Sequence, residues 1–343
     1  MDGETGIIRN PEILDMDFIP SRMVERDGQM KALMSDLMPL IEGGRARNSF
    51  LFGPPGTGKT CMAKYVLEEL SGHTSIFRIY INCWKVATRF NILYEISQQM
   101  GLGARIHRKG TPLDEILSVL EKRTSEKRCI IVLDEVDQIE EDKVLYDILS
   151  LPGACLVMIS NNPHAFHRTD PRIMSRLTSM DVIEFPRYTA EELVSILSDR
   201  VEWSLFPGRI KKSLLTRIAE ASRGDARRAI EILRLSAEEA EKAGLDCITE
   251  DVVNRFLSVQ VSAGREERRD VLNPYQKLIL DILKSGETNS SRLFEKLRDA
   301  CREKGLEPVV DRTFRKYISH MLRLGAIKVK KSGRERVYSL GEG

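Results

Sequence analysis

Eight consecutive residues, Gly53 to Thr60, combine glycines, a lysine and a hydroxyl side chain at a spacing that suits phosphate chemistry. They fit the pattern G-x-x-x-x-G-K-[ST]. Glycines let the backbone wrap tightly, so that successive N–H groups face bound phosphates. Lys59 can then reach the β- and γ-phosphates, and the Thr60 hydroxyl can join the shell of a Mg²⁺ ion. The segment predicts a site for a nucleotide with Mg²⁺, made of Gly53, Pro54, Pro55, Gly56, Thr57, Gly58, Lys59 and Thr60.

Two adjacent acidic residues, Asp134 and Glu135, directly follow an apolar run at 129–133. Next to a phosphate-binding loop, the first carboxylate can join the coordination shell of Mg²⁺, and the second can orient and polarise the attacking water. We therefore predict that Thr60 and Asp134 hold the metal and that Lys59, Asp134 and Glu135 are catalytic.

Other polar residues stand where they can complete such a site. Asn161 follows the next apolar run and suits the γ-phosphate or the water, although its segment also reads as an ordinary turn and Asn162 is the reserve candidate. Arg172 and Arg176 are four residues apart, on one face of an expected helix. One of them could reach the γ-phosphate of a nucleotide bound to a neighbouring subunit. The alternative is that they form surface ion pairs. Arg227 begins a later helix, from which it can fold over the phosphates.

The elements that must position these residues read as alternating strands and helices. Apolar runs without alternation are typical of strands covered on both faces in a parallel sheet. We expect them at 48–52, 76–81, 129–133, 155–160 and 182–185. This pattern predicts a three-layer α/β domain over 1–187, with an inserted helical element at about 82–122. A helical domain is expected over 188–260, beginning at a capping sequence Thr189-Ala190-Glu191-Glu192.

Composition excludes a membrane-spanning protein and shows an uneven charge. No stretch approaches the ~20 apolar residues that a span requires, and we expect a cytoplasmic protein with reduced cysteines. The chain has a net charge of +2, but residues from Val271 onward carry 16 Lys and Arg against 9 Asp and Glu. A basic terminal domain over 271–343 indicates an anionic partner. We expect Trp84 and Trp203 to be packing residues.

That terminal domain reads as helices followed by a basic hairpin, which is typical of a winged helix. Within 311–322 the apolar stripe comprises Phe314, Ile318, Met321 and Leu322, with Asp311 as the expected N-cap. Basic residues lie off that stripe and in the hairpin, which favours DNA over the alternative, a protein-binding domain. The predicted DNA contacts are Arg312, Arg315, Lys316, Lys330, Lys331, Arg334 and Arg336.

Taken together, the motifs resemble the AAA+ ATPases and, within them, the origin-recognition and Cdc-type replication initiators of archaea. The resemblance covers nearly the whole chain and rests on Phe18-Ile19-Pro20 with Arg26, GPPGTGKT, DEVD, Ser160-Asn161-Asn162, DPRIMSRL and GDARRA, in that order. It implies an AAA+ domain with an all-α lid and a C-terminal winged helix. The chain is short for the family and has Glu25 where the family has His.

The resemblance also implies roles for single residues. Phe18, Ile19 and Arg26 would lie beside bound ATP or ADP. Asn161 would be the sensor-one residue, Arg176 the arginine finger and Arg227 the sensor-two arginine. The family carries an extra helical element after the second strand, and here Lys85 and Arg89 at its start suit a DNA backbone contact. A solvated loop is the alternative for that element.

The resulting prediction is an ATP-dependent initiator that binds double-stranded origin DNA and is nucleoid-associated. It would help to load the replicative helicase with other initiator subunits, and slow ATP hydrolysis would act as a switch. Two alternatives are an AAA+ motor of the branch-migration type and a nucleotide-switched signalling protein whose winged helix binds protein. The inserted element and the basic hairpin argue against both.

Overall fold

The structure is a computed structural model that describes residues 6–341, apart from 74–75, 104–105, 107–109, 167–169, 178, 258–273, 285, 305–308, 324–325 and 333–334. It divides into two compact units, Met1–Val253 and Asn254–Gly343, which we describe separately.

The first unit contains a five-stranded parallel sheet in the order β2-β3-β4-β1-β5. Its strands are β1 (Ser49–Phe52), β2 (Phe77–Asn82), β3 (Cys129–Asp134), β4 (Ala154–Ser160) and β5 (Asp181–Glu184). Every residue of β3 is buried, as expected for a strand covered on both faces. The two edge strands are β2, which pairs only with β3, and β5, which pairs only with β1.

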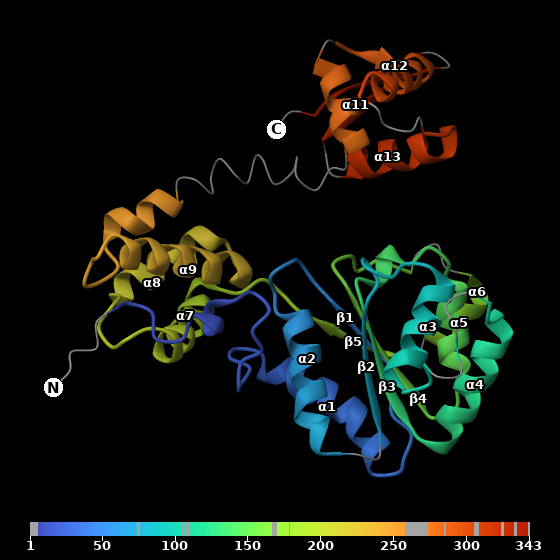
Figure 1. Cartoon of the computed structure of the whole chain (residues 1–343), viewed down its shortest axis with the longest axis horizontal. Helices are drawn as coiled ribbons and strands as arrows, with labels where there is room; N and C mark the ends of the chain where they lie inside the picture. Colours follow the sequence, from blue (N-terminus) through green and yellow to red (C-terminus); the bar gives the residue numbers. More distant parts are fainter. Residues whose placement is uncertain are drawn as a thin grey trace. The chain divides into compact units, whose positions relative to one another are not determined.

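Helices cover both faces of this sheet and make the three layers predicted from the sequence (Figure 1). One face carries α1 (Asp27–Ile41) and α2 (Lys59–Glu69); the other carries α3 (Arg89–Gln99), α4 (Leu113–Glu126), α5 (Lys143–Ser150) and α6 (Pro171–Leu177). Alternate residues of β3 face the two opposite layers of helices. Ile130 and Val132 pack with the first set of helices, and Ile131 and Leu133 pack with the second.

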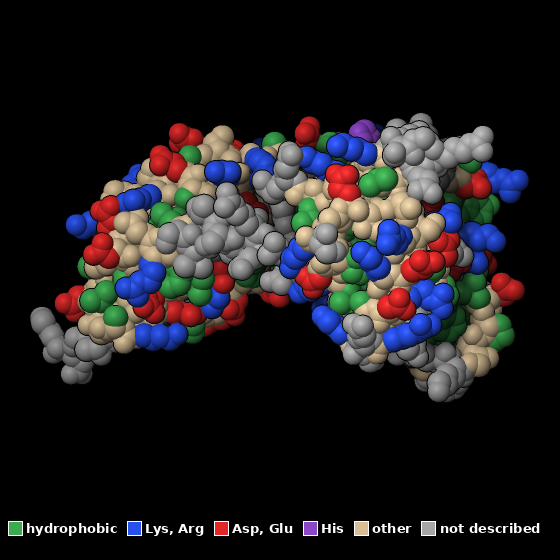
Figure 2. Space-filling model, turned by 90° about the horizontal axis from the view of Figure 1, so that it is seen from above, with side chains coloured by type: hydrophobic (Ala, Val, Ile, Leu, Met, Phe, Trp, Pro, Cys, Tyr) green, Lys and Arg blue, Asp and Glu red, His purple; other side chains and the backbone are tan. Residues whose placement is uncertain are grey.

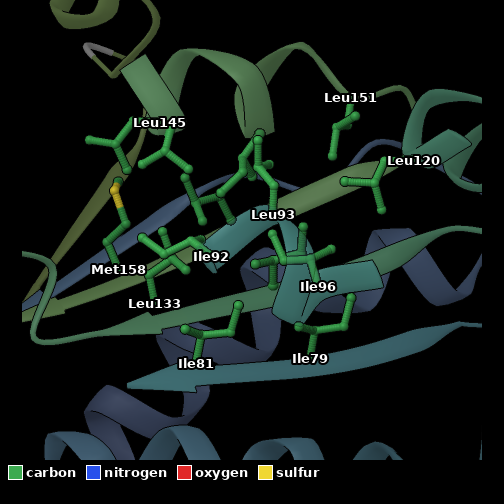
Figure 3. Packing of buried hydrophobic residues seen from close by; sticks show 14 of the residues in the cluster. Ile79, Ile81, Ile92, Leu93, Ile96, Leu120, Leu133, Leu145, Leu151 and Met158 are labelled. Atoms are coloured by element: carbon green, nitrogen blue, oxygen red, sulfur yellow. The ribbon is translucent and has the colours of Figure 1, made fainter. Parts of the chain in front are cut away.

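The inserted element is integrated into the second layer through α3. Figure 3 shows Ile79 and Ile81 of β2 facing Ile92 and Ile96 of α3, and all four are fully buried. The second helix of the element, α4, continues to Glu126, past the expected end near residue 122. Short 3₁₀ turns complete the unit: η1 (Pro11–Leu14), η2 (Leu70–Gly72) and η3 (Val136–Gln138).

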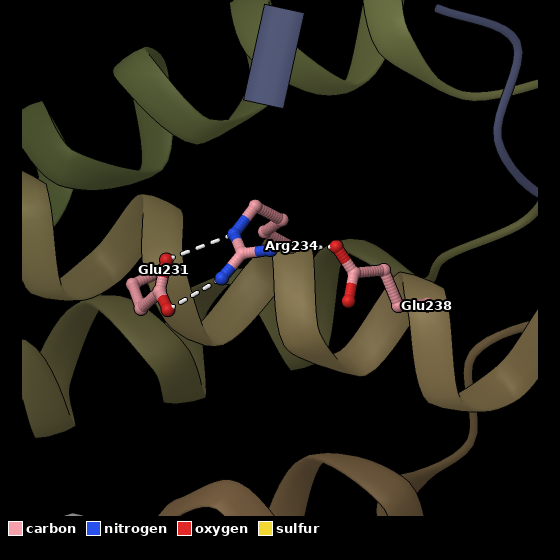
Figure 4. Close-up of polar contacts among 3 residues, drawn as sticks. All are labelled: Glu231, Arg234 and Glu238. Atoms are coloured by element: carbon pink, nitrogen blue, oxygen red, sulfur yellow. Dashed lines mark hydrogen bonds and ion pairs between the residues drawn. The ribbon is translucent and has the colours of Figure 1, made fainter. Parts of the chain in front are cut away.

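The lid helices follow β5 and are α7 (Ala190–Ser204), α8 (Lys212–Ser222) and α9 (Ala226–Lys242), with residues 250–257 also helical. Thr189 and Glu192 form the expected capping box at the start of α7. On α9, the Arg234 guanidinium binds Glu231 through two bonds and Glu238 through a third (Figure 4). These i,i+3 and i,i+4 pairs support the helix that carries Arg227 in its first turn.

The second unit consists of α11 (Pro274–Lys284), β6 (Thr288–Asn289), α12 (Ser290–Glu303), α13 (Asp311–Arg323), β7 (Ile327–Ser332) and β8 (Glu335–Leu340). Its antiparallel sheet has the order β6-β8-β7, and Phe314, Ile318 and Met321 are buried as expected. This arrangement agrees with the winged-helix prediction. Asp311 is the first helical residue rather than a cap, and its carboxylate pairs with Arg315 at 2.8 Å.

The expectation that Trp84 and Trp203 pack in the interior is wrong. The two residues are 61% and 53% exposed. The size of a tryptophan side chain does not by itself determine the face on which it lies. On the face drawn in Figure 2, basic and acidic side chains are interspersed. Within the described part of the chain, no helix is long and apolar enough to cross a membrane.

Candidate functional site

The phosphate-binding loop joins β1 to α2, and helix α2 begins at Lys59. Gly56 and Gly58 have φ values of +72° and +93°, which glycine adopts without strain. The Lys59 ammonium donates to the carbonyl oxygens of Gly53 and Pro54, each at 2.7 Å. Burial, followed by the charge of Arg227, lowers the pKa of Lys59 to about 8. Oxygens of a bound phosphate can therefore replace these two carbonyl oxygens as hydrogen-bond acceptors of the Lys59 ammonium.

The two residues predicted to hold the metal lie side by side. The Thr60 hydroxyl donates to Asp134 Oδ2 at 2.8 Å, and the Glu135 amide donates to Asp134 Oδ1 at 2.9 Å. Asp134 is 3% exposed. A hydroxyl and a carboxylate are the oxygen donors that Mg²⁺ prefers, so the residues present fit this ion.

Glu135 stands out by its backbone. Its φ of +56° and ψ of +47° lie in the left-handed region, which costs a non-glycine residue about 1–2 kcal/mol and tends to occur at functional sites. Burial, then the neighbouring charges of Asp134 and Asp137, raise the pKa of its carboxyl group. A raised pKa makes a carboxylate a better acceptor for the proton of an attacking water.

The carboxyl ends of β3 and β4 are tied together beside Glu135. The Ser160 hydroxyl donates to Asp137 Oδ1 at 2.6 Å, and the Asn162 amide donates to Ser160 Oγ at 2.9 Å. The Asn162 side chain accepts the backbone N–H of His164 and so forms a turn. Asn161 lines the cavity described next, which favours it over Asn162.

A cavity of about 370 Å³ brings most of the predicted residues together. This is within the size range of small-molecule sites, and it lies at the carboxyl ends of the strands, where open α/β sheets bind ligands. Its lining includes the predicted residues Phe18, Ile19, Pro55, Gly56, Thr57, Gly58, Lys59, Thr60, Asp134, Glu135, Asn161 and Arg227.

Arg26, predicted to bind the nucleotide, is not among the lining residues. Its guanidinium lies 3.7 Å from the Tyr188 ring centroid and donates to the carbonyl oxygens of Thr57 and Pro186. Arg26 therefore braces the phosphate loop against the segment between β5 and the lid.

Sequence reasoning missed several lining residues, among them Tyr188 and Arg200. Arg200 of α7 donates to the carbonyl oxygens of Ile13 and Phe18 and lies 4.8 Å from the Phe18 ring centroid. Burial lowers the pKa of Arg200. It holds the Phe18 segment against the lid, and no motif in the sequence marks it.

The lid also touches the phosphate loop directly. The Ala226 amide donates to the Gly56 carbonyl at 2.9 Å, and Asp225 caps α9 by accepting the Arg228 amide. A Cβ atom on Gly56 would lie 1.9 Å from Asp225 Oδ1. The start of α9 and the loop are therefore in close contact.

Arg176 lies away from this cavity, on the exposed side of α6. It donates to Ser150 Oγ at 2.8 Å, and its guanidinium lies 4.2 Å from the Tyr146 ring centroid. Arg172 is also exposed. Neither arginine lines the cavity of its own chain. This is the position expected of a residue that acts on a nucleotide bound to a neighbouring subunit.

The predicted DNA contacts fall into two groups. At the inserted element Lys85 is exposed, but Arg89 makes a two-bond pair with Asp147 at 2.6 and 3.0 Å, and a DNA contact by Arg89 would require that pair to break. In the second unit Arg315, Lys330 and Arg336 are exposed. Arg334 lies outside the described residues, as do the side chains of Arg312, Lys316 and Lys331.

Comparison with protein-family models finds two matches, an AAA domain over residues 42–163 and a Cdc6 AAA+ ATPase-type lid domain over residues 194–256. Among curated proteins, the chain is 35% identical over 337 residues to ORC1-type DNA replication protein 9 of Halobacterium salinarum, covering 97% of this chain and 94% of that protein. It is 36% identical over 292 residues to ORC1-type DNA replication protein 1 of the same organism, covering 84% and 94%.

Among solved structures, the Aeropyrum pernix ORC1 protein in complex with DNA matches with a TM-score of 0.78. It is 28% identical to this chain, and the match covers 98% of this chain and 94% of that one.

Proposed function

This chain belongs to the family of ORC1-type DNA replication proteins, which are AAA+ ATPases, and we propose that it is an ATP-regulated initiator that binds double-stranded DNA at a replication origin. The observation that carries the proposal is the single cavity in which Lys59, Asp134, Glu135, Asn161 and Arg227 meet. These residues come from the phosphate loop, two strand ends and the lid, so a nucleotide bound there would contact both the sheet domain and the lid.

In this proposal each residue has a distinct task. Lys59 binds the β- and γ-phosphates, and Thr60 and Asp134 hold Mg²⁺, which when bound supplies positive charge to the phosphate oxygens. Glu135 accepts a proton from the attacking water, and Asn161 orients that water or the γ-phosphate. A second copy of the chain, or another initiator subunit, contributes Arg176 in trans.

Hydrolysis is proposed to be slow and to act as a switch. The slow rate is proposed from the family resemblance alone. The support for a switch is the contact between α9 and the phosphate loop through Gly56 and Ala226, since the loop conformation and the lid position are then coupled. ATP and ADP would differ in how Arg227 engages the γ-phosphate, and the lid position would report that difference.

DNA is proposed to bind through the second unit, largely by phosphate contacts. From Asp311 onward the chain carries nine Lys and Arg against three Asp and Glu. Association with the nucleoid is proposed because it follows from DNA binding, and a part in loading the replicative helicase is proposed from the family resemblance alone. A branch-migration motor and a protein-binding signalling switch are the competing functions.

The test combines fluorescence anisotropy on duplex DNA with ATPase turnover, using the full chain. Each neutralised phosphate contributes about −0.9 to the slope of log K against log salt. The double variant Lys330→Ala, Arg336→Ala should therefore flatten that slope by up to about two. The matched control is Lys284→Ala, Arg302→Ala, which removes two charges already paired with Asp281 and Asp299.

Each function predicts a different result. The initiator predicts salt-sensitive DNA binding that the hairpin variant weakens more than the control, with slow ATP turnover. Continuous turnover stimulated by DNA would favour the motor. Absence of DNA binding by the wild-type chain would favour the signalling switch and reject the proposal.

A further inference from the structure

The carboxylate of Asp134 receives a hydrogen bond from a residue outside every nucleotide motif. The Tyr80 hydroxyl donates to Asp134 Oδ2 at 2.6 Å, to the same oxygen that accepts the Thr60 hydroxyl at 2.8 Å. With the Glu135 amide on Oδ1, three donors fix this carboxylate. Two of them belong to the nucleotide motifs, and Tyr80 is the third.

Tyr80 reaches Asp134 from the edge strand of the sheet. Strand β2 pairs with β3 on one side only, with Tyr80 opposite Val132. Lys64 of α2 lies over the Tyr80 ring, with its ammonium 5.2 Å from the ring centroid. The ring therefore lies between the phosphate-loop helix and the residue expected to hold the metal.

The backbone of Tyr80 is held by a side chain instead of a neighbouring strand. Gln99 Oε1 accepts the Tyr80 N–H at 3.0 Å, and Gln99 Nε2 donates to the Tyr80 carbonyl at 3.0 Å. These are the two groups that an edge strand leaves unpaired. Gln99 is the last residue of α3, which belongs to the inserted element. A continuous chain of hydrogen bonds thus runs from α3 through Tyr80 to Asp134.

We propose that Tyr80 is a positioning residue for Asp134, and that Gln99 fixes Tyr80 to helix α3 so that the inserted element supports the metal-holding carboxylate. The inference rests on the proposed role of Asp134 in holding Mg²⁺. With the Tyr80 hydroxyl in place, the Asp134 carboxylate is held in one orientation before Mg²⁺ binds. Without the Tyr80 hydroxyl, the carboxylate becomes ordered only when Mg²⁺ binds. The ion therefore binds less tightly.

The experiment measures the affinity of the full chain for a fluorescent ATP analogue across a Mg²⁺ titration, with EDTA as the zero point. Tyr80→Phe removes only the hydroxyl. It should raise the Mg²⁺ concentration of half-maximal effect about tenfold, which is the change expected for the loss of one hydrogen bond to a charged group. The affinity in EDTA should stay unchanged, because the phosphate loop is intact.

Two further variants separate positioning from folding. Tyr94→Phe makes the same chemical change on α3, where Tyr94 stacks on Phe90, and should leave the Mg²⁺ midpoint at the wild-type value. Gln99→Met removes both bonds to the Tyr80 backbone but keeps the Tyr80 side chain. It should shift the midpoint in the same direction by roughly threefold, since β2 remains paired with β3.

A Mg²⁺ midpoint for Tyr80→Phe equal to that of the wild type and of Tyr94→Phe would overturn the positioning role. A Mg²⁺ midpoint for Gln99→Met equal to that of the wild type would overturn the link to α3. This result can be obtained even if Tyr80→Phe does not fold. If the wild-type chain itself shows no Mg²⁺-dependent ATP binding, the proposed function fails, and this inference fails with it.

Discussion

Replacing Gly56 by alanine should loosen the contact between the lid and the phosphate loop. Gly56 has a φ of +72°, and a Cβ atom there would lie 1.9 Å from Asp225 Oδ1. Relief of that overlap requires either Asp225 or the start of α9 to move. Either movement breaks the Asp225 cap on the Arg228 amide or the bond from Ala226 to Gly56.

The expected magnitude has three contributions. The left-handed backbone alone costs an alanine about 1–2 kcal/mol. Loss of the helix cap adds about 0.5–2 kcal/mol, and loss of the backbone bond adds about 0.5–1.5 kcal/mol. Gly244 offers a matched control within the lid, because its φ is +66° and a Cβ there would meet nothing within 4 Å. Gly56→Ala should therefore cost about 0.5–3.5 kcal/mol more than Gly244→Ala, the lower value if one of these two interactions is lost and the upper value if both are lost.

Amide hydrogen exchange read by mass spectrometry measures this difference locally. In the nucleotide-free protein, peptides covering the first turn of α9 should exchange at least about twofold faster in Gly56→Ala than in Gly244→Ala, at 1.4 kcal/mol per factor of ten. Equal exchange in the two variants would show that the lid does not rest on Gly56 in solution, and the proposed coupling of loop and lid would fall.

Three further predictions concern single residues. Glu135→Gln should still bind ATP but hydrolyse it about 10²–10⁴-fold more slowly; turnover at the wild-type rate would show that another group handles the water. Arg176→Ala should lose ATPase activity at concentrations that support assembly, and mixing it with Lys59→Ala subunits should restore part of it; full activity of the variant alone would move the role to Arg172. For Asp36, burial and then the hydrogen bond with Asp181 raise the pKa of its carboxyl group to about 6. The native state therefore holds this proton more tightly than the unfolded state, and stability is lost as pH rises through 6. Asp36→Asn should raise the free energy of unfolding at pH 7.5 by about 1–2 kcal/mol, and the gain should vanish by about pH 4. Thermal melts across pH measure this gain, and a gain that is the same at both pH values would refute the assignment.

The sheet and its nucleotide motifs were predictable because their signals are local. Strands buried on both faces are continuous apolar runs, so each predicted strand lies within one residue of its observed bounds at either end. Since the carboxyl ends of parallel strands meet at one edge, Asp134 and Asn161 were expected beside the phosphate loop, and both line the cavity there.

The contacts that were missed depend on partners far away in the sequence. Arg89 is 58 residues from Asp147, and Tyr80 is 54 residues from Asp134. No spacing rule links such pairs. Whether Arg26 faces the nucleotide or the back of the loop depends likewise on side-chain packing against Tyr188, which the resemblance to a family does not determine.

The most direct test of the central claim is chromatin immunoprecipitation with sequencing of this protein in its own cells, compared with a marker-frequency map of replication in the same culture. The account predicts sharp enrichment at one or a few chromosomal loci that coincide with peaks of replication start. Enrichment spread evenly along the chromosome, or peaks that lie away from every replication start, would contradict it.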